Sequence, residues 1–187
     1  MLRDKKYLEK VIDSDSTIRI TEMNTEMGEY IVGAYLKLIK ECDFIEYSVR
    51  RPGGHRAGLN ELDVMGLDFK NKTAYLCEVA THLEGLNYGS GGTPTVERIG
   101  KKYAQLREYA ESHLPSTFPK RHFMFWSPVV SAGVAEELKQ IKGLELVINE
   151  DYAACVDELL KQARSITYDT GNPAFRIFQI LGHLRRR

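Results

Sequence analysis

The chain contains 187 residues, of which 43% are hydrophobic and 28% are charged. This composition is sufficient for a packed core and excludes a disordered chain. The 26 lysine and arginine residues are balanced by 26 aspartate and glutamate residues, which excludes a strongly basic, histone-like binder of nucleic acid. The length predicts a single domain over residues 1–187.

The two halves of the chain differ in charge, and neither carries a membrane or secretion signal. Residues 1–96 contain 12 basic and 15 acidic side chains, whereas residues 97–187 contain 14 and 11, which weakly favours a basic face in the second half. No apolar run reaches the roughly 18 residues of a membrane span, and the N-terminus lacks an apolar signal region. We therefore expect a cytoplasmic protein whose three cysteines are free, buried thiols.

Hydrophobic periodicity predicts a helix followed by three strands in the first half of the chain. Apolar residues recur at steps of three and four over residues 22–41, as one face of a helix requires. Apolar segments separated by turn residues predict strands over 44–51, 61–69 and 73–80. The short polar link between the last two strands predicts an antiparallel hairpin.

Helices and strands then alternate in the second half. Residues 85–92 form a glycine-rich segment without the spacing of a nucleotide-binding loop, which favours a mobile connector. The predicted elements after it are a helix over 96–113, a strand over 122–127, a helix over 132–141, a strand over 144–149 and helices over 152–163 and 173–184. This order predicts an α/β fold in which helices flank a mixed central sheet.

Acidic residues interrupt two of the predicted strands. Strand alternation puts Glu61, Asp63 and Met65 on one face of the first strand, and Leu62 and Val64 on the other. On the second strand it puts Leu76, Glu78 and Ala80 on one face, and Tyr75, Cys77 and Val79 on the other. Burying both Asp63 and Glu78 is costly unless a cation or a shared proton neutralises them. Adjacent carboxylates are typical ligands of Mg²⁺. Ion pairs with arginine or lysine from flanking helices, or solvated strand ends, would explain the same pattern.

The segment Gly58-Leu59-Asn60-Glu61-Leu62-Asp63-Val64-Met65, followed by Tyr75-Leu76-Cys77-Glu78-Val79-Ala80-Thr81, resembles the core of the PD-(D/E)XK nuclease superfamily. The resemblance covers about residues 22–130 and implies a restriction-endonuclease-like αβββαβ core. Residues 131–187 would then form a C-terminal extension of further β and α elements. The predicted order of helix, three strands, helix and strand is the order of this family's core.

The resemblance also implies roles for individual residues. Asp63 matches the first metal-binding acid and Glu78 the second, and the carbonyl of Val79 would be a further ligand. Glu29 matches a glutamate donated by the first helix. Glu61 matches an acid sometimes found just before the aspartate. The bound ion would be Mg²⁺ or Mn²⁺.

The sequence departs from the family pattern at Ala80, which stands where the motif has lysine. In active members that lysine orients or deprotonates the attacking water and offsets charge on the phosphate, which a methyl group cannot do. Lys101 or Lys102 of the following helix would replace it in one explanation. His82 would act as base or ligand in a second, and in a third, catalysis has been lost.

Basic residues near these acids are candidates for contact with nucleic acid. Arg51 and Arg56 lie on the turn before Asp63, and Arg98 and Lys101 lie on the following helix. Such groups supply affinity for phosphates and no base specificity. No self-contained DNA-reading motif is present in the sequence.

The sequence thus predicts a Mg²⁺- or Mn²⁺-dependent endonuclease that hydrolyses phosphodiester bonds in DNA, with RNA left open as a substrate. Cleavage of two strands is commonly the work of a dimer, so a homodimer is a further expectation. The alternative is a catalytically inactive nuclease-like module that binds nucleic acid or a protein partner. In a third hypothesis, the resemblance is accidental and the protein is another small α/β enzyme.

Overall fold

The sheet at the centre of the molecule is mixed and has five strands. The computed structural model describes residues 10–11, 19–20, 25–50, 61–86 and 92–185. The strands lie in the order β3 (Phe44–Arg50), β4 (Glu61–Asp68), β5 (Thr73–Val79), β6 (Lys120–Ser127) and β7 (Leu144–Ile148). Strands β3, β4 and β5 pair antiparallel, and β5, β6 and β7 pair parallel. A separate pair, β1 (Lys10–Val11) and β2 (Arg19–Ile20), is antiparallel.

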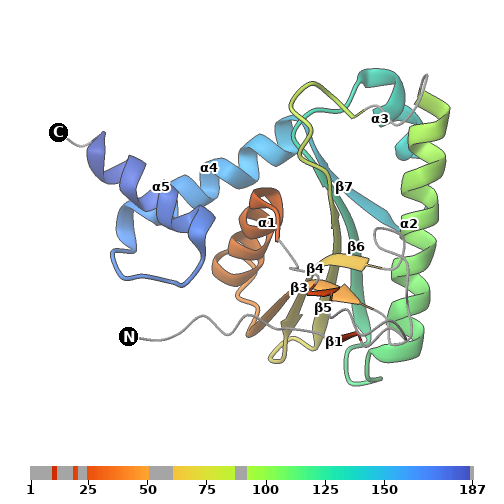
Figure 1. Ribbon diagram of the computed structural model, residues 1–187, viewed down its shortest axis with the longest axis horizontal. Helices are drawn as coiled ribbons and strands as arrows, with labels where there is room; N and C mark the ends of the chain where they lie inside the picture. Colours follow the sequence, from red (N-terminus) through yellow and green to blue (C-terminus); the bar gives the residue numbers. More distant parts are fainter. Residues whose placement is uncertain (1–9, 12–18, 21–24, 51–60, 87–91, 186–187) are drawn as a thin grey trace.

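Helices cover both faces of this sheet (Figure 1). They are α1 (Met27–Leu38), α2 (Gly92–His113), α3 (Ala132–Leu138), α4 (Glu150–Ser165) and α5 (Pro173–Leu184). On one face, here called the α1 face, α1, α4 and α5 bury a core centred on Leu36, Trp126 and Phe175. On the other, the α2 face, α2 and α3 bury two smaller clusters around Leu76 and Phe125.

The element order confirms the predicted fold class. Helix α1, strands β3 to β5, helix α2 and strand β6 follow one another as αβββαβ, and α3, β7, α4 and α5 complete the chain. A mixed sheet with flanking helices is consistent with a restriction-endonuclease-like fold. In the part of the chain that the structure describes, no helix is long and apolar enough to cross a bilayer.

Helix boundaries differ from the predicted ones where local chemistry outweighs periodicity. Helix α2 begins at Gly92 instead of residue 96, because Pro94 fits the first turn of a helix, where its missing N–H is not needed. Helix α5 begins as predicted, with Pro173 in its first turn and the Asn172 side chain accepting a 2.9 Å hydrogen bond from the Phe175 N–H. Cys42, Cys77 and Cys155 are free; the first two are buried and the third is half-buried.

Strand β3 is held against α1 by a close contact at Gly33. The Tyr47 ring lies over this glycine, so that a Cβ there would overlap the hydroxyl and stand 2.6 Å from Cζ. Tyr47 cannot easily yield, because Tyr30 packs on its ring at 5.1 Å and Asn172 donates to its hydroxyl at 3.2 Å. Glycine at this helix position is therefore a packing requirement.

We expect Gly33→Ala to lower the free energy of unfolding by about 2 kcal/mol through overpacking, although alanine is the better helix former. Gly182→Ala in α5 is the matched control, since its nearest neighbour would be Arg164 Cγ at 3.7 Å; it should raise stability by about 0.5 kcal/mol. Urea unfolding curves measure both. Equal effects of the two substitutions would contradict the Tyr47 contact.

Candidate active site

Asp63 lies where strand β4 leaves its partner β5. The ladder runs from Asp68 opposite Thr73 to Val64 opposite Cys77. One residue further, the Asp63 carboxylate accepts a 2.7 Å hydrogen bond from the backbone N–H of Val79 through Oδ2. A side chain thus replaces the backbone acceptor that β4 would otherwise supply, which fixes the carboxylate against the end of β5.

This exchange reverses the faces of β4, and the predicted alternation is wrong there. Met65 and Leu62 both pack on the α2 face, although they lie three residues apart, whereas Val64 packs on the α1 face. The strand turns over at Asp63 because it no longer follows the ladder. Strand β5 keeps the predicted alternation, with Leu76 and Ala80 on the α2 face and Cys77 on the α1 face.

Glu78 points to helix α2 and forms an ion pair with Lys102. The ammonium Nζ lies 3.0 Å from Oε1 and 3.2 Å from Oε2. The Lys102 side chain is 9% exposed and the Glu78 side chain is 15% exposed, so the pair is largely withdrawn from water. Lys102 belongs to the buried stripe of α2 with Ile99 and Leu106, whereas Lys101 is exposed. The spacing from Ile99 and Leu106 is the sequence signal that separates the two lysines.

Glu29 lies in the first turn of α1, close enough to Asp63 for the two charges to interact. Its Oε2 accepts a 3.4 Å hydrogen bond from the Ser48 hydroxyl of β3. Burial, and then repulsion by Asp63, raise the pKa of Glu29 to about 7. Sequence reasoning missed Ser48; a lone serine inside an apolar strand was its only signal.

Burial raises the pKa of both Asp63 and Glu78. The Val79 N–H and the Lys102 ammonium act against this rise at Asp63, and repulsion by Asp63 adds to it at Glu78. The Lys102 ammonium also favours the ionised form of Glu78 but does not cancel the burial. The three carboxylates therefore bind protons more tightly than exposed acids do.

Ala80 packs among apolar side chains, and His82 lies beyond the end of strand β5. Ala80 is buried on the α2 face among apolar side chains that include Leu86, Ile99 and Phe125. Its backbone N–H donates to the Trp126 carbonyl at 2.9 Å. His82 would share the face of Glu78 only if strand β5 continued to it, but β5 ends at Val79. His82 is exposed.

The basic candidates fall into two groups. Arg98 and Lys101 are exposed on α2, and the Arg98 charge acts on Glu78. Arg51 and Arg56 lie outside the described residues. Glu61 lies 3.9 Å from the Arg50 guanidinium, at the edge of an ion-pair contact.

The donor set fits a hard divalent cation. Within the described ranges, no group of three or more histidine, cysteine, aspartate or glutamate residues is placed to hold a metal ion. Mg²⁺, however, is typically held by one or two carboxylates with waters completing the shell. Asp63, Glu78 and the Val79 carbonyl are oxygen donors of that kind, and a cation would offset the burial and repulsion that raise the two pKa values.

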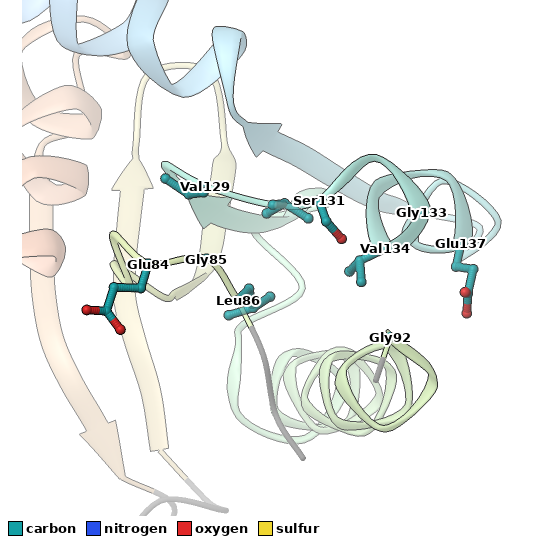
Figure 2. Close-up of a pocket in the computed structure, with 10 residues that line it drawn as sticks. Glu84, Gly85, Leu86, Gly92, Val129, Ser131, Gly133, Val134 and Glu137 are labelled. Atoms are coloured by element: carbon teal, nitrogen blue, oxygen red, sulfur yellow. The ribbon is translucent and has the colours of Figure 1, made fainter. Parts of the chain in front are cut away.

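A cavity of about 600 Å³ lies apart from these acids, between the segment after β5, the start of α2 and helix α3 (Figure 2). None of Asp63, Glu78 and Lys102 lines it, whereas Glu84 and Glu137 do. Acidic walls disfavour a polyanion. Beside Lys102 there is only a crevice of about 10 Å³, lined also by Glu61 and Gln105, which has room for about one water.

The chain matches no family model and no curated protein. Among solved structures it is similar to a repair endonuclease from Pyrococcus abyssi, with 16% identity and a TM-score of 0.37. The similarity covers 69% of this chain and 49% of the endonuclease, so the chain spans about half the length of that protein.

The raised carboxyl pKa values predict a stability that falls with rising pH. Glu29 shifts from 4.5 to about 7 on folding, so the folded state binds more protons than the unfolded state between these values. Its contribution to stability is full below about pH 4.5 and is lost as pH rises through 7. In EDTA, we expect the melting temperature to fall more between pH 5 and pH 8 for the parent than for Glu29→Gln, by about 2–4 °C. An equal fall in both proteins would contradict the shift.

Proposed function

We propose that this protein is a divalent-cation-dependent nuclease that hydrolyses phosphodiester bonds in DNA, with Lys102 in the place of the motif lysine. The observation that carries the proposal is the buried contact of the Lys102 ammonium with the Glu78 carboxylate at 3.0 Å. It brings the amine from helix α2 to the acid that, in the family motif, stands two residues before the lysine. Asp63 and Glu78, with the Val79 carbonyl, are the proposed ligands of Mg²⁺ or Mn²⁺.

Each group has a distinct part in this mechanism. A cation bound by Asp63 and Glu78 supplies Lewis-acid stabilisation of charge on the phosphoryl oxygens. The Lys102 ammonium offsets the negative charge that grows on the phosphate in the transition state. Glu29, with its pKa of about 7, has a carboxylate matched to neutral pH and accepts a proton from the attacking water at Oε1, because Oε2 already accepts the Ser48 hydroxyl.

Arg98 and Lys101 are the proposed phosphate contacts on α2, because both are exposed on the helix that carries Lys102. They would position the backbone of the nucleic acid without reading its bases. Arg51 and Arg56 belong to the same proposal from the sequence alone. Action on both strands by a homodimer stays a prediction.

Lys102→Met should reduce the cleavage rate by about 10²–10³-fold, the loss typical of one electrostatic group at a transition state. Asp63→Asn and Glu78→Gln should reduce it at least as much. Lys101→Met is the comparison variant, because Lys101 is the exposed neighbour on the same helix; as a phosphate contact it should weaken DNA binding and change the rate at saturating DNA less than tenfold. The assay measures relaxation and linearisation of plasmid DNA in Mg²⁺, Mn²⁺ or EDTA. Equal losses for Lys101→Met and Lys102→Met would reject the assigned role of Lys102.

The second candidate function is a catalytically inactive module that binds nucleic acid or a protein partner. The observation in its favour is Ala80, which is 7% exposed and packed among apolar residues where the motif has lysine. In this case Lys102 would only neutralise Glu78.

Titration with Mn²⁺ separates the two functions. A nuclease site should bind Mn²⁺ with an affinity that rises between pH 6 and pH 8, because the carboxylates must lose their protons to bind the ion. Glu78→Ala should abolish this binding, as followed by the electron paramagnetic resonance signal of free Mn²⁺. Identical titrations of parent and variant, together with no cleavage, would favour the inactive module.

A further inference from the structure

Ser48 has a backbone conformation that is unusual for the interior of a strand. Its φ angle is 51°, in the left-handed region, and its side chain is buried with the residue 6% exposed. Residues other than glycine avoid this region because Cβ crowds the following carbonyl. Such conformations persist only where the surroundings impose them, and they cluster at functional sites.

The conformation of Ser48 reverses the faces of β3. Ile45 and Tyr47 pack on the α1 face, whereas Val49, two residues beyond Tyr47, packs on the α2 face. A regular strand would keep all three on one face. The reversal therefore falls at Ser48.

The neighbouring strand reverses at the same level of the sheet. Tyr47 pairs with Val64, and Val49 pairs with Leu62, so Ser48 lies opposite Asp63. Asp63 is the residue at which β4 turns over to bond the Val79 N–H. Because both strands reverse at the same level, their pairing continues past this point. The Ser48 hydroxyl and the Asp63 carboxylate then belong to residues that lie opposite each other on the two strands.

The hydroxyl of Ser48 is directed to the acid of helix α1. Its Oγ donates to Glu29 Oε2 at 3.4 Å. The helix that carries Glu29 is packed against β3, since Tyr47, the residue before Ser48, lies against Gly33 and Tyr30 of α1. Strand β3 thus determines both where α1 sits and where the carboxylate of its first turn lies.

We propose that Ser48 is a positioning residue that holds the Glu29 carboxylate beside Asp63, and that its left-handed backbone is maintained for this purpose. The proposal rests on the proposed nuclease function, in which Glu29 takes the proton of the attacking water. If the role of Ser48 is structural, replacing it changes the stability of the protein. If Ser48 is a positioning residue, loss of its hydroxyl lowers the cleavage rate.

Two substitutions separate these roles. Ser48→Gly removes the hydroxyl and relieves the backbone strain, so the melting temperature should stay at or above that of the parent while kcat falls about tenfold or more and KM is unchanged. Ser48→Thr keeps the hydroxyl but places a β-branched residue at positive φ, so the melting temperature should fall by about 2–4 °C while kcat stays within about twofold. Lys72→Gly, at φ 53° in the β4–β5 hairpin, is the control that relieves strain without changing cleavage.

Other results of the same measurements would contradict a positioning role for Ser48. The role of Ser48 would be overturned if kcat rose or fell together with the melting temperature in both variants. Full activity in Ser48→Gly would also overturn it. If the parent itself cleaves no DNA, the nuclease function fails, and crystal structures of parent and Ser48→Gly decide the remaining question. A Glu29 carboxylate displaced in Ser48→Gly supports the positioning role, and an unmoved carboxylate overturns it.

Discussion

The buried ion pair between Lys102 and Glu78 determines how helix α2 meets the acidic end of the sheet. Lys102 lies on the apolar stripe of α2 between Ile99 and Leu106, so its ammonium group enters this interface only because a charged partner is present. Glu78 supplies that partner at 3.0 Å. Replacing a buried pair of this kind by apolar residues is often neutral or stabilising by about 1–4 kcal/mol. Packing alone therefore does not explain the pair, which is consistent with the proposed chemistry at the acids.

The same helix explains how alanine is accommodated at position 80. Ala80 and Glu78 lie on the α2 face of β5, and Ile99 of α2 packs in the cluster that contains Ala80. A lysine at 80 would have to displace Ile99 or Leu86 to reach the carboxylates. Ile99 of α2 covers Ala80, and Lys102 lies one turn further along the same helix. Helix α2 therefore both fills the apolar space beside Ala80 and carries the amine that contacts Glu78. Ala80 and Lys102 are thus structurally linked.

The sequence predicted the features that depend on periodicity and composition. Strands β4 and β5, the helix after them and the mixed sheet followed from apolar spacing, and Asp63 and Glu78 stood out as acids within apolar strands. The face reversal at Asp63 could not be predicted, because it arises when a side chain takes the hydrogen bond of Val79 in place of the ladder. Ser48 was missed for the same reason, since a left-handed serine opposite Asp63 is a product of pairing between strands. Lys102 was one of two candidate lysines, and its spacing from Ile99 would have selected it.

The charges of the site show why its acids require a further partner. Asp63, Glu78 and Glu29 are three carboxylates, and the Lys102 ammonium is the positive group bonded among them. If all four groups were ionised, two negative charges would remain in a largely buried place. Burial is the first cause of the raised pKa values, and repulsion between acids adds to it. Protons meet this demand at low pH, and a single divalent cation would meet it at neutral pH without protonating the groups proposed as ligands and base. An arrangement that is destabilised by its own charge at neutral pH is consistent with the proposed catalytic role, because active sites often sacrifice stability.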